Sequence, residues 1–89
     1  MKNYLTESAR VKTAQFRVFK EILAKHGIFR DKQVCEILGM KQQTYSARIR
    51  GGQLNLSLIE LQKLIIKLNL SAKEVYMLVK GVSEWQEHQ

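Results

Sequence analysis

The stretch DKQVCEILGMKQQTYSARIRG, residues 31–51, decides the fold. Its central Gly39 separates two short segments, and in each one apolar residues recur three or four positions apart, as on one face of a helix. The first helix is predicted over residues 31–38, with the Asp31 carboxylate as its cap. The second is predicted over about residues 42–50, where two glycines end it. The side chains expected to face inward are Val34, Cys35, Leu38, Tyr45 and Ile49.

Three further helices are predicted outside this stretch. One precedes it, from about Ser8 to His26, and has the apolar period of an amphipathic helix. Two follow it, at about residues 57–68 and 71–80, and each opens with Ser-x-x-Glu, the sequence of a capping box. The helix at 57–68 is expected to be the central helix of the core because its apolar stripe is broad: Leu58, Leu61, Leu64, Ile65 and Leu68.

The length and the helix pattern together define the domain organisation. A chain of 89 residues is long enough for one compact core and too short for two. The predicted fold is therefore all-α, a compact bundle of five short helices in one domain over residues 1–81. Residues 82–89 are expected to form a C-terminal tail.

The charge is unevenly placed along the chain. The net charge is +7, and residues 1–50 carry 11 Lys and Arg against 4 acidic residues, whereas residues 51–89 carry 4 of each. A basic half on a folded domain suits a polyanion, most often nucleic acid, because each neutralised phosphate releases condensed counterions. The alternative is a solvated surface that only aids solubility.

Several function classes lack the residues they need. Cys35 is the one cysteine, so no internal disulfide is expected, and on an inward face it is interpreted as a small apolar residue. His26 and His88 have no neighbours at metal-ligand spacing, and Asp31 is the one aspartate, so neither a zinc site nor a Ser-His-Asp arrangement can be assembled. We expect no enzyme, no metal and no cofactor.

No membrane segment is predicted. The most apolar run, residues 64–66, is bracketed by Lys63 and Lys67, far short of the roughly 20 apolar residues that span a bilayer. Residues 1–5 do not resemble the apolar core of a signal peptide. A cytoplasmic location is therefore expected.

Residues 31–51 match the requirements of a helix-turn-helix. In that motif the second helix lies in the major groove of DNA while the first braces it across the backbone. The turn favours glycine because its first residue commonly has a positive φ, and Gly39 supplies it. Met40 would fill the space beneath the turn, and the small Cys35 would allow the two helices to approach closely. A DNA-binding function follows as the principal hypothesis.

The same residues resemble the lambda-repressor-like, Cro/cI or Xre family of helix-turn-helix regulators over roughly residues 10–80. The strongest stretch is Leu38-Gly39-Met40-Lys41-Gln42-Gln43-Thr44-Tyr45-Ser46, followed by Arg50-Gly51, Leu56-Ser57-Leu58 and Leu68-Asn69-Leu70-Ser71. The spacing of the two glycines also matches that family. The resemblance implies a sequence-specific regulator of transcription, such as a phage or mobile-element repressor or a Cro-like protein.

The resemblance also implies roles for individual side chains. Gln42 and Gln43 stand where lambdoid repressors read bases, and a glutamine amide can pair with adenine N6 and N7 through a donor and an acceptor together. Further candidates for bases are Lys41, Thr44 and Ser46. The side chains expected to contact phosphates, which fix register without reading sequence, are Lys32, Gln33, Arg48, Arg50 and Asn55.

Three positions depart from the family pattern, and they motivate an alternative. Asp31 would repel a phosphate, Ala47 replaces a long polar reader, and Arg48 stands where an aliphatic residue is usual. The alternative function is a protein-binding module that reuses the fold, such as an antirepressor. The resemblance also implies a homodimer, because related regulators often pair through their last helix or tail, with Val82, Trp85 and the last helix as the candidate contact; Trp85 could equally fold back onto that helix.

Overall fold

The computed structural model describes residues 6–83, and in this range it is all-helical, which confirms the predicted fold class. Every helix begins and ends within about two residues of its predicted bounds. No helix in the described range combines the length and apolar character needed to cross a membrane. The elements are α1 (Glu7–Lys25), α2 (Asp31–Leu38), α3 (Gln42–Arg48), the short 3₁₀ turn η1 (Arg50–Gly52), α4 (Leu58–Leu68) and α5 (Ala72–Lys80).

The last two helices begin with the reciprocal caps that their sequences predict. At α4, the Ser57 hydroxyl accepts from the Glu60 amide at 3.1 Å, and the Glu60 carboxylate accepts from the Ser57 amide at 2.9 Å. Ser71 and Glu74 repeat the arrangement at α5, with distances of 3.1 and 3.0 Å. Each cap satisfies two backbone amides that the helix itself leaves unpaired. These bonds explain why both starts are predictable from sequence.

The cap predicted for α2 is wrong. Asp31 is the first residue of the helix, and the extended residue before it is Arg30. From a helical position the Asp31 carboxylate no longer lies where an N-cap side chain would accept from the next turn. Gln33 takes over instead: its side-chain oxygen accepts from the amides of Phe29 and Arg30, both at 3.1 Å. Asp31 still places a negative charge in the first turn, which the helix dipole favours.

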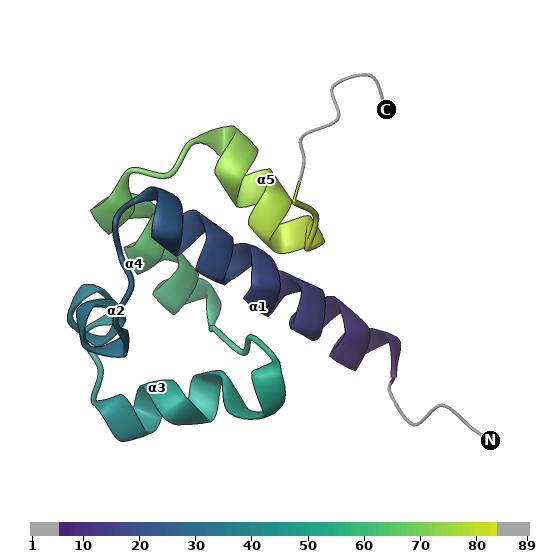
Figure 1. Ribbon diagram of the computed structural model, residues 1–89, viewed down its shortest axis with the longest axis horizontal. Helices are drawn as coiled ribbons and strands as arrows, with labels where there is room; N and C mark the ends of the chain where they lie inside the picture. The colour runs from purple at the N-terminus through teal and green to yellow at the C-terminus, as the bar shows by residue number, and fades with distance from the viewer. Residues whose placement is uncertain (1–5, 84–89) are drawn as a thin grey trace.

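The helices form two packed groups, α1 with α5 and α2 with α3 and α4, and both groups contribute side chains to one core (Figure 1). The long α1 crosses the molecule diagonally and packs against α5. α2 packs against both α4 and α3, and α3 lies along the lower edge of the view. The α2–α3 unit is therefore carried on one side of the bundle, with α5 on the opposite side of α1.

The central helix of the core is α1, and the prediction that the helix at 57–68 fills this place is wrong. Four side chains of α1 are no more than 2% exposed: Val18, Phe19, Ile22 and Leu23. In α4 only Leu64 is fully buried, whereas Leu58, which was expected to face inward, is 84% exposed. The apolar stripe of α4 is thus packed against the core from Leu61 to Leu68, and its first residue, Leu58, is left outside the core.

The junction of α1 with α5 depends on a glycine. Gly81 ends α5 with φ +74°, and a Cβ added there would lie 3.0 Å from the Ala14 Cβ. Beside it, the Gln15 side chain donates to the Val79 carbonyl at 2.7 Å. The close backbone approach at Gly81 allows α5 to lie directly on α1.

Tyr45 attaches α3 to the core and is fully buried, at 0% exposure. Its hydroxyl has no hydrogen-bond partner among the described residues. Burial, with smaller contributions from Asp31 and Cys35, raises the pKa of Tyr45 to about 12, so the ring is neutral at physiological pH. The core therefore carries one unpaired polar atom, which costs stability.

We expect the Tyr45→Phe variant to be more stable than the wild type by about 1 kcal/mol, because it removes an unpaired buried hydroxyl and keeps the ring. The measurement is the free energy of unfolding in urea. Tyr45→Ala is the control and should lose about 3–5 kcal/mol through the cavity it leaves. A Tyr45→Phe variant less stable than the wild type would show that the hydroxyl is paired in solution.

Candidate nucleic-acid interface

The turn between α2 and α3 has the conformation that the sequence predicts. Gly39 ends α2 with φ 67° and ψ 39°, in the left-handed region that glycine adopts at little cost. The next amide, of Met40, donates to the Cys35 carbonyl at 3.1 Å, and the Met40 side chain packs against the core. Cys35 itself is a buried free thiol, 8% exposed, and burial raises its pKa, so it is an apolar packing residue as expected.

α3 presents one polar face to solvent. With about 100° of rotation per residue, Gln42, Gln43 and Ser46 fall within one arc of roughly 100°. All three are exposed. Tyr45 lies outside this arc and is buried in the core. The structure therefore brings these three predicted base-reading residues together on one side of α3.

Lys41 and Thr44, the other two base-reading candidates, lie differently. Lys41 is the exposed N-cap residue of α3, next to Gln42. Thr44 is half-buried and lies on the neighbouring side of the helix, outside the arc of the glutamines. Lys41 thus adjoins the polar face, whereas Thr44 is turned away from it.

A shallow depression lies between α2 and the start of α3. The exposed side chains around it are Lys32, Glu36, Lys41 and Gln42, with Cys35 and Met40 as its apolar part. Two of the predicted contacts from different helices, Lys32 and Lys41, are therefore brought to one place. Two cations beside a glutamine provide both charge for a phosphate and an amide for a base edge.

The remaining phosphate candidates differ in what their side chains are free to do. Arg50 and Asn55 are exposed. The backbone N–H of Asn55 donates to the Arg48 carbonyl at 2.8 Å, so this bond leaves the Asn55 side chain free. Gln33 is half-buried, and its oxygen is occupied by the cap of α2. Its NH₂ group, the part that would donate to a phosphate, takes no part in that cap.

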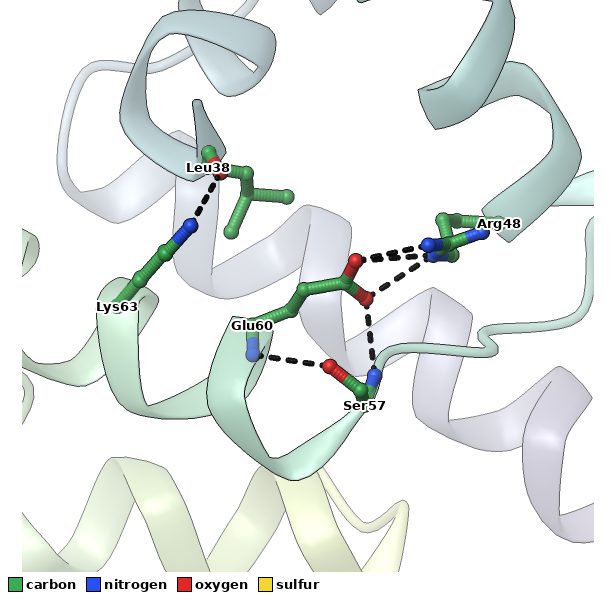
Figure 2. Close-up of polar contacts among 5 residues, drawn as sticks. All are labelled: Leu38, Arg48, Ser57, Glu60 and Lys63. Atoms are coloured by element: carbon green, nitrogen blue, oxygen red, sulfur yellow. Dashed lines mark hydrogen bonds and ion pairs between the residues drawn. The ribbon is translucent and has the colours of Figure 1, made fainter. Parts of the chain in front are cut away.

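Arg48 is paired within the protein and does not stand free as a phosphate contact (Figure 2). Its Nε lies 3.0 and 3.1 Å from the two carboxylate oxygens of Glu60, and its Nη2 lies 2.9 Å from Oε2. The reason is its place on α3: it lies between Thr44 and Tyr45 in rotation, on the side that faces α4. We therefore exclude Arg48 from the phosphate contacts proposed below.

Glu60 is a functional candidate that the sequence analysis identifies only as a cap. The Arg48 hydrogen bonds lower the pKa of the Glu60 carboxyl against the opposing effect of burial, and the Ser57 amide adds to the lowering. The same contact raises the pKa of Arg48. Ser57-x-x-Glu60 signals the cap, but no local spacing signals a pair 12 residues apart.

Two more side chains link helices outside the polar face of α3. Lys63 of α4 donates to the Leu38 carbonyl at the end of α2, at 3.4 Å (Figure 2). His26, considered above as a metal ligand, lies 2.9 Å from the Glu74 carboxylate. No group of three or more His, Cys, Asp or Glu in residues 6–83 is placed to hold a metal ion.

Comparison with models of protein families, with curated proteins and with solved structures found no match. The lambda-repressor-like resemblance therefore remains a prediction. It depends on the glycine spacing and on the residues of α3.

We predict that stability falls in acid partly through Glu60. Because its folded-state pKa lies below the unfolded value of about 4.3, its contribution is present above that pH and is lost as pH falls through the folded value. The free energy of unfolding of Glu60→Gln should therefore lie below that of the wild type at pH 7, and the difference should shrink towards pH 3. Glu21→Gln, which removes an exposed carboxylate of α1, is the control. A difference that stays constant with pH would contradict the assignment.

Proposed function

We propose that this protein is a sequence-specific, double-stranded DNA-binding regulator of transcription, such as a phage or mobile-element repressor or a Cro-like protein. α3 would lie in the major groove, and α2 would brace it across the backbone. The observation that carries the proposal is the placement of Gln42, Gln43 and Ser46 on one exposed face of a helix that Tyr45 anchors from behind. It would act in the cytoplasm by occupying its operator.

The chemistry of this face divides into reading and positioning. The two glutamine amides can each donate and accept, which suits the N6 and N7 edge of adenine. Lys32, Lys41 and Arg50 are exposed cations of the α2–α3 unit and of the turn that follows it, and they would neutralise phosphates. No cofactor is required, because binding alone blocks the site.

A second copy of the chain is the proposed partner on DNA. Two α3 helices related by a two-fold axis would meet half-sites about 34 Å apart. Beside Leu58, which is 84% exposed, and Val79 of the last helix, which is 50% exposed, lies a cleft with no charged lining residue. An uncharged surface lets two chains of net charge +7 approach without facing like charges. Val82 packs against the core, and Trp85 lies outside the described residues.

The function is tested by selecting sites from a pool of random duplexes and measuring binding to the selected site and to random duplex across a salt series. We expect one palindromic sequence to be enriched and the affinity to fall steeply with salt. Absence of any sequence preference at low salt would contradict the proposal. It would favour the alternative, a protein-binding module that reuses the fold.

The roles of individual residues give a sharper prediction. Gln42→Ala and Gln43→Ala should each weaken the selected site by about 10- to 100-fold and random duplex by much less, because they remove base contacts. Arg50→Ala should weaken both about equally and reduce the salt slope by about one. Gln62→Ala, on the exposed surface of α4, is the control. Equal losses on both duplexes for all variants would overturn these roles.

The dimer surface is tested by placing a charge on it. Leu58→Glu should shift the protein towards monomer in sedimentation equilibrium, because two carboxylates would face each other across the axis. Ile66→Glu, which charges an exposed apolar position elsewhere on α4, should not. A dimer unaffected by Leu58→Glu would place the contact on another surface.

A further inference from the structure

Two polar contacts tie α4 to the two helices of the α2–α3 unit. Glu60 reaches the end of α3 through Arg48, and Lys63, one turn later, reaches the end of α2 through the Leu38 carbonyl (Figure 2). Neither contact belongs to the exposed face of α3. These two contacts can therefore determine the orientation of α3, and with it the direction of its exposed face.

α3 has few attachments of its own. It is seven residues long, less than two turns, and its one fully buried side chain is Tyr45. A single anchor near the middle of a short helix leaves its tilt to the contacts at its ends. At the C-terminal end these are the half-buried Ile49, the bond from the Asn55 amide to the Arg48 carbonyl, and the Arg48–Glu60 pair.

The Arg48–Glu60 pair is the directional one among these contacts. The planar guanidinium meets both carboxylate oxygens through two nitrogens, which fixes orientation as well as distance. Glu60 is itself held in place by the reciprocal cap with Ser57, and its side chain is only 12% exposed. An acceptor that cannot move holds the end of α3 in one position.

We infer that Glu60, acting through Arg48, is a positioning residue for base discrimination; the inference rests on the proposed DNA-binding function. The distance along α3 from the Tyr45 anchor to Gln42 is about 4.5 Å at 1.5 Å per residue, so a tilt of about 10° about that anchor moves the Gln42 end by about 0.8 Å. Hydrogen bonds to base edges need distances of about 2.7–3.2 Å and cannot absorb that displacement. Contacts of flexible lysine side chains with phosphates can absorb a displacement of this size.

The test compares Glu60→Gln with Glu74→Gln. Both variants remove one carboxylate from the third position of a Ser-x-x-Glu cap, both keep a side chain that can close the cap, and both raise the net charge by one. Glu60 contacts α3, whereas Glu74 contacts His26 on the opposite side of the bundle. Any difference between the variants therefore reports on α3.

For Glu60→Gln we expect discrimination between the selected site and random duplex to fall by about tenfold, while affinity for random duplex does not fall. Glu74→Gln should keep wild-type discrimination. Residual dipolar couplings, measured without DNA, should show α3 reoriented relative to α4 in Glu60→Gln only. Unchanged couplings of α3, or equal effects of the two variants, would overturn the inference. A wild type without sequence preference would instead contradict the proposed function, and the couplings would still decide the position of α3.

Discussion

The burial of Tyr45 is the constraint on which the presentation of α3 depends. Its ring lies at 0% exposure beneath a helix of seven residues. Because a helix this short is marginal by itself, its stability and position come from what it packs against. Burial of one side of α3 also determines which side faces solvent, and that side carries Gln42, Gln43 and Ser46.

The helices themselves are predictable from sequence because their ends carry local signals. Ser57 with Glu60, and Ser71 with Glu74, close caps within four residues, and Gly39 adopts the left-handed conformation that its place in the turn requires. Each of these depends only on neighbours along the chain. The exposure of the polar face of α3 follows in the same way, from the helical period around Tyr45.

Features that depend on the neighbouring helices are not predictable in this way. The period of α4 marks Leu58 as apolar and in register with the stripe, but whether another helix covers it depends on how the helices pack, and Leu58 stays exposed. Likewise, Arg48 carries the charge of a phosphate contact, but its rotation on α3 turns it towards Glu60. Asp31 has the right side chain for a cap and lies one residue too far into the helix.

Of the residues that depart from the predicted lambda-repressor-like pattern, Arg48 has a physical explanation in the structure. Arg48 lies at an inward-facing position of α3, and Glu60 balances its charge, so an ion pair holds the end of this helix. Ala47 is exposed, and nothing in the structure explains its replacement of a longer side chain.

Titration of the isotopically labelled protein with its selected duplex, followed by amide chemical shifts, tests the central claim most directly. We expect the largest changes on residues 41–46 and at Lys32, in the α2–α3 unit, and little change in α5 except on dimer formation. Changes centred on the apolar cleft beside Leu58 and Val79, with none at Gln42 and Gln43, would contradict it.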